Sequence, residues 1–284
     1  MTTTLDESRQ YCQQLAKQTG KNFYYSFLTL PAEMRRDMCV LYAFMRITDD
    51  IGDDESIDLT QRRQNLKSWK HSLEATLSGE TAEHLIFPAL LDIIQRRQIP
   101  VEYLYDVIEG VSQDLEPHRF ETCGELEQYC YHVAGAVGLC CIHIWGFKGD
   151  DVREPAVACG AAFQLTNILR DIAEDADRSR VYLPQQDLQQ FGYTEDDLLH
   201  RVNDDRFRAL MQFEVARARQ YYEQAEELFA SLSKEGQPIL RAMIRIYGGL
   251  LNKIEARNYD VYSSRVSLSK LKKWSIVARS FVGM

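Results

Sequence analysis

Proline and strand-like segments are scarce in this chain. Its 284 residues include seven prolines, and no long stretch alternates between apolar and polar residues as a half-buried strand would. The longest apolar run, residues 133–147, is shorter than a membrane span and carries His143, so it predicts a buried core helix. The first ten residues, MTTTLDESRQ, contain no apolar region. We therefore expect no secretory signal and a cytoplasmic location.

Paired cysteines and excess positive charge are also lacking. The seven cysteines form no CxxC pair, which predicts reduced, buried thiols rather than a disulfide framework. The formal net charge of −9 argues against nucleic acid as a partner. An anionic substrate would need basic residues or metal ions gathered locally. The sequence makes no prediction about the oligomeric state.

Helical periodicity dominates what is present. We expect helices at 6–17, 31–51, 59–77, 82–97, 102–115, 121–145, 154–172, 204–232, 237–256 and 269–281. The one clear interruption, at 175–193, contains Pro184 and Gly192. No fixed repeat or low-complexity linker divides the chain. The pattern predicts a single all-α domain over residues 1–284, with about ten helices around a central space.

A first acidic cluster ends the apolar segment VLYAFM. On a helix, Asp49 and Asp53 are one turn apart with Asp50 beside them, and Arg46 and Tyr42 continue the same stripe. Stacked carboxylates at a helix C-terminus repel one another and oppose the helix dipole, so a cation should compensate them. Magnesium suits such oxygen ligands and commonly bridges one or two carboxylates to substrate phosphates. The alternative is a solvated acidic turn.

A second polar stripe lies in QLTNILRDIAED. Asn167, Asp171 and Asp175 are spaced i, i+4 and i+8, and Gln164 and Arg170 flank them. The small, apolar residues VACGAAF precede this stripe, so it too emerges from a core helix. Two such stripes facing each other across a cavity would hold several magnesium ions against a diphosphate.

The loop that follows the second stripe, DRSRVYLP, carries further polar candidates. Arg178 and Arg180 could donate charge-assisted hydrogen bonds to a bound diphosphate. Tyr182 could lie over the cavity mouth. The alternative is an ordinary polar connection, but the position directly after the second stripe favours the functional interpretation.

Several segments together resemble the squalene/phytoene synthase family of head-to-head prenyltransferases. They are KNFYYSFLTLP, LYAFMRITDDIGDD, YCYHVAGAVG, QLTNILRDIAED with SRVYLP, and IYGGLLNKIEARNYDVYSSRVSLSKLKK. They span most of the chain in the family's order, and the short form without a C-terminal membrane helix is most similar to bacterial presqualene diphosphate and squalene synthases of the hopanoid pathway. One departure is Asn22, where many members carry serine.

The resemblance implies an isoprenoid-synthase α-fold with a central apolar cavity for two prenyl diphosphates. It implies metal binding, by magnesium or alternatively manganese, at Asp49, Asp53, Asn167, Asp171 and Asp175. It implies a catalytic centre made of these residues together with Tyr42, Arg46, Asp50, Tyr129 and Tyr182. It implies substrate contacts from Lys21, Phe23, Phe27, Val133, Val137, Gly138, Gln164, Arg170, Arg180 and Tyr247. NADPH use stays open, because reducing members need no glycine-rich dinucleotide motif.

Three other functions compete with head-to-head condensation. A terpene cyclase ionises one substrate and does not need the Arg-x-Tyr-Leu-Pro segment. Head-to-tail elongation usually needs a longer basic set, and a non-enzymatic helical protein would scatter its acids on outer faces. Within the preferred family, Phe23 and Phe27 on the expected cavity wall favour farnesyl diphosphate, giving presqualene diphosphate, squalene or dehydrosqualene. Geranylgeranyl diphosphate, giving phytoene, is the alternative.

The C-terminal segment 270–284 carries a separate hypothesis. It mixes four basic residues with Trp274, Ile276, Val277 and Phe281. Such an amphipathic helix could contact an anionic membrane surface. The alternative is a helix that packs on the domain and keeps its lysines in water.

Overall fold

The computed structural model describes residues 3–80, 84–117 and 119–281, and all of its regular elements there are helices. The first half of the chain forms α1 (Leu5–Thr19), α2 (Lys21–Phe27), α3 (Ala32–Gly52), α4 (Leu59–Leu77), α5 (Phe87–Arg97), α6 (Val101–Gln113) and α7 (Cys123–Cys130). A π-helical turn η1 (Tyr131–Gly135) then leads into α8 (Ala136–Trp145), α9 (Arg153–Asp177), α10 (Gln185–Gln190) and α11 (Glu195–Leu199). The chain closes with α12 (Asp205–Glu226), α13 (Leu228–Ser231), α14 (Gln237–Ala256) and α15 (Lys270–Ser280). The all-α prediction is confirmed.

Some predicted boundaries were wrong. The helix expected at 82–97 begins at Phe87, with Pro88 in its first turn, and its predicted start falls outside the described residues. The helix expected to end at residue 172 continues to Asp177, so the interruption begins three residues later than predicted. That interruption holds the short helix α10, and α11 follows it. The helix expected at 204–232 is divided into α12 and α13.

The helix predicted at 121–145 contains the π-helical turn η1. This turn lies where α9 approaches most closely, because a Cβ on Gly160 would lie 2.6 Å from the backbone of Ala134. Glycine at 160 therefore allows backbone contact between α9 and η1. Single π turns inside helices are frequent at functional sites, and this one positions Val133 on the wall of the cavity described below.

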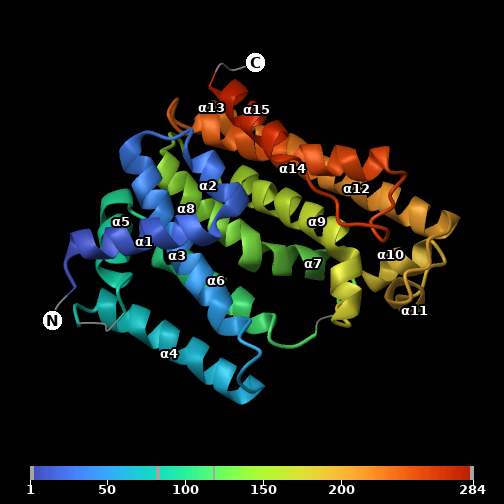
Figure 1. Cartoon of the computed structure of the whole chain (residues 1–284), viewed down its shortest axis with the longest axis horizontal. Helices are drawn as coiled ribbons and strands as arrows, with labels where there is room; N and C mark the ends of the chain where they lie inside the picture. The colour runs from blue at the N-terminus through green and yellow to red at the C-terminus, as the bar shows by residue number, and fades with distance from the viewer. Residues whose placement is uncertain (1–2, 81–83, 118, 282–284) are drawn as a thin grey trace.

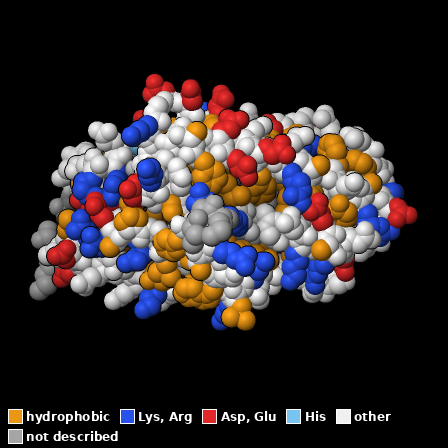
Figure 2. Space-filling view, turned by 90° about the horizontal axis from the view of Figure 1, so that it is seen from above, with side chains coloured by type: hydrophobic (Ala, Val, Ile, Leu, Met, Phe, Trp, Pro, Cys, Tyr) orange, Lys and Arg blue, Asp and Glu red, His pale blue; other side chains and the backbone are white. Residues whose placement is uncertain are grey.

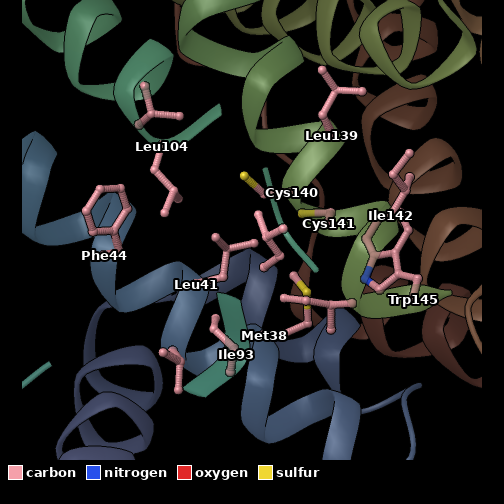
Figure 3. Packing of buried hydrophobic residues seen from close by; sticks show 14 of the residues in the cluster. Met38, Leu41, Phe44, Ile93, Leu104, Leu139, Cys140, Cys141, Ile142 and Trp145 are labelled. Atoms are coloured by element: carbon pink, nitrogen blue, oxygen red, sulfur yellow. The ribbon is translucent and has the colours of Figure 1, made fainter. Parts of the chain in front are cut away.

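Two hydrophobic clusters form the core. The first joins α1, α3, α5, α6 and α8, where Leu41, Phe44, Ile93 and Leu104 are buried close to Cys140 (Figure 3). The second joins α7, α9, α12, α14 and the buried parts of 181–198. In Figure 1, α12 to α15 lie together along the upper side, α4 lies along the lower side, and α3 and α9 run between them.

The run 133–147 behaves as the sequence predicts. Its helix α8 is buried over most of its length, and no helix in the described ranges combines the length and hydropathy needed to cross a bilayer. All seven cysteines are free thiols, six of them buried and Cys123 partly so, which confirms the prediction of unpaired cysteines.

Candidate active site

A cavity of about 650 Å³ lies among α2, α3, α6, η1, α8 and α14. Apolar side chains line most of it: Phe23, Phe27, Met38, Leu41, Met45, Val107, Val111, Val133, Val137, Cys141, Met243, Ile246, Leu250, Val266 and Leu268. Its charged lining comes from the C-terminal half of α3, from α6 and α9, and from residues 265–273: Arg46, Asp49, Asp114, Arg170, Arg265 and Lys273. Met38 and Asp49 both line it from α3, so the cavity extends about 16 Å along that helix at 1.5 Å per residue.

The first acidic stripe occupies the last turn of α3, as predicted. Arg46 pairs with Asp50, and Asp53 forms the helix C-cap. Asp49 meets solvent at the cavity but is surrounded by protein on its other sides. This burial, followed by the charge of Asp53, raises the pKa of the Asp49 carboxyl to about 7. The Nε atom of Arg46 is buried without a hydrogen-bond partner, so this guanidinium retains capacity for an anion.

The second stripe lies on α9, also as predicted, because the helix includes Asn167, Asp171 and Asp175. Asp171 pairs with its neighbour Arg170 and accepts hydrogen bonds from Arg265 at 3.1 and 3.2 Å. Burial, followed by the charge of Asp171, raises the pKa of Asp175 to about 7.

The segment after α9 brings the two stripes together. The backbone N–H of Arg180 bonds to the carbonyl of Asp175 at 2.8 Å, while Val181 next to it is buried. Burial alone would lower the pKa of Arg180, but Tyr182, Asp114, Asp53 and Asp175 raise it overall. Acids of both stripes thus act on one guanidinium. Arg178 is exposed. Its positive charge lowers the pKa of Asp175 less than the other neighbours of that carboxyl change it, which places Arg178 at the edge of the site.

A tyrosine cluster packs beside this segment. Tyr129 is 4% exposed and donates to Asp114 at 3.0 Å. The Tyr129 and Tyr182 rings stack with centroids 5.4 Å apart. Burial raises the pKa of Tyr182 to about 12, so its hydroxyl stays protonated at neutral pH. Neither tyrosine contributes to the cavity lining itself.

Aromatic rings form one wall of the cavity. Phe27 is 2% exposed and its ring lies 6.2 Å from that of Tyr42, whose hydroxyl donates to Thr19 at 3.2 Å. Phe23 is 37% exposed and lies between the rings of Tyr42 and Tyr247, at 6.4 and 6.2 Å. The short helix α2 therefore points both phenylalanines toward one side, as their spacing predicts.

The remaining predicted residues occupy mixed positions. Val133 and Val137 line the cavity. Gly138 packs closely against α9, because a Cβ there would lie 2.9 Å from the Ala156 carbonyl oxygen, and its contact with substrate stays a prediction. Gln164 accepts a long hydrogen bond of 3.5 Å from Asn167, away from the lining. Lys21 begins α2, but its side chain lies outside the described part of the chain.

Three charged cavity residues escaped the sequence analysis. Arg265 and Lys273 belong to the C-terminal segment, and Asp114 is the C-cap of α6. The first two lie in SSRVSLSKLKK, at the end of the last segment that carries the family resemblance, where neither residue was assigned a role in the site. Arg265 bonds to a residue 94 positions away, so no local spacing reveals it.

The acidic residues were tested for their fit to magnesium. Within the described ranges, no three His, Cys, Asp or Glu side chains are grouped closely enough to hold a metal ion by themselves. Magnesium usually takes one or two protein carboxylates and completes its shell with water and phosphate oxygens. Burial, followed by neighbouring carboxylates, raises the pKa values of Asp49 and Asp175, and the charges of Arg46 and Arg180 offset this only in part. The oxygen donors on the two stripes therefore fit magnesium bound together with a diphosphate.

Comparison with known proteins gives consistent results. Residues 16–272 match the family model described as squalene/phytoene synthase. The chain is 37% identical over 282 residues to a 15-cis-phytoene synthase from Synechocystis sp., covering 95% of this chain and 83% of the relative. It is 34% identical to the chloroplastic phytoene synthase 1 of Zea mays, over 95% of this chain and 67% of the relative.

Two solved structures share the fold. A dehydrosqualene synthase in complex with a ligand superposes with a TM-score of 0.89 at 26% identity, covering 98% of this chain and 97% of that one. Squalene synthase HpnC from Alicyclobacillus acidocaldarius superposes with a TM-score of 0.84 at 28% identity, covering 90% and 95%. The arrangement of helices around the cavity is therefore the one these synthases use.

Proposed function

The chain belongs to the squalene/phytoene synthase family of head-to-head prenyltransferases, and we propose that it condenses two molecules of farnesyl diphosphate, with release of diphosphate, to presqualene diphosphate or the C30 products derived from it. The observation that carries this proposal is the placement of two acidic stripes, on α3 and α9, beside one apolar cavity with an aromatic wall.

The charged residues suit diphosphate binding. Arg46, Arg170, Arg265 and Lys273 line the cavity and can donate charge-assisted hydrogen bonds to phosphate oxygens. Asp49, Asp53, Asn167, Asp171 and Asp175 would hold magnesium, which supplies the charge neutralisation that makes diphosphate a good leaving group. Burial, followed by the charge of Asp53, raises the pKa of Asp49, and magnesium bound with the substrate would offset the charge of both carboxylates.

The apolar part of the cavity suits the rest of the reaction. When the C1–O bond of the first substrate breaks, the electron pair leaves with the diphosphate and an allylic cation remains. The apolar lining excludes water from this cation, and the faces of Phe23, Phe27 and Tyr42 can stabilise it. The double bond of the second substrate then attacks C1, and loss of a proton closes the cyclopropane ring.

The aromatic wall supports our choice of the shorter substrate. The buried ring of Phe27 lies against Tyr42 and occupies space on the α2 side of the cavity that it lines. A narrower cavity favours the C15 substrate. The second candidate is condensation of two geranylgeranyl diphosphates to phytoene, and it is favoured by the 37% identity to a curated phytoene synthase over nearly the whole chain.

One experiment tests both levels of this proposal. The purified protein is incubated with farnesyl diphosphate, with geranylgeranyl diphosphate and with an equal mixture, each with and without magnesium, while diphosphate release and product mass are measured. We expect a C30 product and magnesium-dependent release. A predominant C40 product would establish the second candidate, whereas a monomeric C15 product would refute head-to-head condensation.

A further inference from the structure

Exposed apolar side chains are concentrated on the last described helix. Across the ranges that the structure describes, five large hydrophobic residues are exposed, and three of them lie at the C-terminal end: Leu271 at 83%, Trp274 at 49% and Phe281 at 58%. Together with Ala278 they are spaced i, i+3, i+7 and i+10 from Leu271, so they form one stripe along α15 and its C-cap. We call these four residues the outer stripe.

The outer stripe is distinct from the face that holds α15 on the domain. That inner face is formed by Ile276, Val277 and Ser280, which are buried. The helix packs against α14 and α2, and the Trp274 ring meets Tyr25 of α2 edge-on at 5.1 Å. The alternative, a helix that packs on the domain, therefore describes one face of α15, while the outer stripe remains exposed in the part of the chain that the structure describes.

Basic residues flank the outer stripe. Residues 269–281 contain Lys270, Lys272, Lys273 and Arg279 and no acid, in a chain whose net charge is −9. Lys272 and Arg279 also border a groove of about 660 Å³ between α12, α14 and α15. Arg219 and Arg245 add two further cations to this groove, and Glu223 and Glu226 add two acids. Figure 2 looks onto the side formed by α12 to α15, and there hydrophobic and basic side chains lie next to one another near the centre.

The stripe also adjoins the substrate cavity. Lys273 of α15 and Leu268 just before the helix line that cavity, as does Phe23 of α2, itself 37% exposed. Tyr25, which contacts Trp274, lies two residues after Phe23 on the same short helix. A surface that covered the outer stripe would thus lie beside the cavity.

We propose that the outer stripe and its flanking cations dock the protein onto an anionic lipid bilayer. Apolar side chains with an interfacial tryptophan and basic neighbours are the combination that holds a helix in the plane of a membrane surface. Charge complementarity selects a negative surface, because this helix is the basic part of an acidic protein. One part of this inference rests on the proposed function: a C30 product would leave the cavity next to the bilayer in which it dissolves.

Vesicle sedimentation tests the docking without requiring activity. The parent protein should pellet with vesicles of phosphatidylglycerol and phosphatidylcholine, pellet less with phosphatidylcholine alone, and be released by high salt. The double variant Leu271→Ser with Phe281→Ser should lower the bound-to-free ratio about tenfold or more. Lys272→Gln with Arg279→Gln should remove the preference for anionic vesicles. Leu85→Ser, at an exposed leucine of 45% outside α15, is the matched control and should bind as the parent does.

Two outcomes would overturn the docking. One is a parent protein that does not pellet with anionic vesicles, or a Leu271/Phe281 variant that pellets equally. The other is a parent that sediments as a dimer without lipid and becomes monomeric in that variant, because the stripe would then cover a second copy. Diphosphate release from farnesyl diphosphate is measured on the same samples without vesicles. A parent protein that releases diphosphate but does not bind vesicles would contradict only the docking. A parent protein that binds vesicles but releases no diphosphate would contradict only the proposed function.

Discussion

Replacing Phe27 by alanine separates the role of its ring in the cavity wall from its role in stability. The ring is 2% exposed, and it packs near Tyr42 and Tyr24 on one side while the other side borders the 650 Å³ cavity. Truncating a buried phenylalanine costs about 3–5 kcal/mol of unfolding free energy. Part of this ring already faces open space, so the loss should be near the lower end, about 3 kcal/mol.

Phe44→Ala is the matched control. Phe44 lies on α3 like much of the cavity wall, but it is fully buried, stacks on Trp69 at 5.8 Å and does not reach the cavity. Its loss should approach about 5 kcal/mol. Stability and product length should therefore respond differently in the two variants. Phe27→Ala should lose less unfolding free energy and change product length, whereas Phe44→Ala should lose more unfolding free energy and leave product length unchanged.

The assay is the ratio of C40 to C30 product from an equal mixture of the two diphosphates, on protein whose folding is checked by circular dichroism and denaturant unfolding. We expect the ratio to rise in Phe27→Ala relative to the parent. An unchanged ratio in folded Phe27→Ala would show that the ring is an ordinary core residue and does not determine which substrate length the cavity accepts. If Phe44→Ala cannot be purified folded, Phe44→Leu provides the same comparison with a smaller loss.

Three further changes follow from the structure. Asp49→Asn or Asp171→Asn should keep the fold and lower diphosphate release by orders of magnitude, and near-parental rates in limiting magnesium would contradict the two-stripe site. Gly160→Ala should destabilise the protein because its Cβ would meet the η1 backbone at 2.6 Å, whereas Gly248→Ala, with nothing within 4 Å, should gain up to about 1 kcal/mol in denaturant unfolding; equal effects would refute the close α9–η1 contact. Burial raises the pKa of Glu214 from 4.5 to about 8, although the charge of Arg217 opposes this shift. As the pH rises from 4.5 to about 8, the unfolded chain ionises this carboxyl more readily than the folded one, so the parent loses stability. The unfolding free energy of Glu214→Gln should therefore improve relative to the parent over that range, and a pH-independent difference would refute the assignment.

Local patterns in the sequence predicted the helices and both stripes correctly because these depend on spacing within one helix. Asp49 and Asp53, or Asp171 and Asp175, are one turn apart whatever surrounds them. Short elements were missed for the opposite reason. Helix α10 has six residues, and so brief a segment carries little periodicity of its own.

The cations and close contacts of the site required the tertiary structure. Arg265 reaches Asp171 across 94 residues of sequence. Gly138 was predicted on the cavity wall from the family resemblance, and only the structure shows that its lack of a side chain allows close contact with the Ala156 carbonyl. Apolar character alone does not tell which helix face meets the cavity and which meets a neighbouring helix, because both environments favour the same residue types.

An acidic protein can bind an anionic substrate when its cations are gathered in one place. The chain has a net charge of −9, but Arg46, Arg170, Arg265 and Lys273 all line the cavity. Asp171 holds two of these guanidinium groups in position through its bonds to Arg170 and Arg265. At the same time the pKa values of Asp49 and Asp175 are raised, so one site contains carboxylates that favour a bound cation and basic residues that favour a bound anion. A diphosphate bound with magnesium satisfies both, because its oxygens pair with the arginines while its metal pairs with the carboxylates. Either one alone would leave one set of charges uncompensated, which is why metal and substrate should bind cooperatively here.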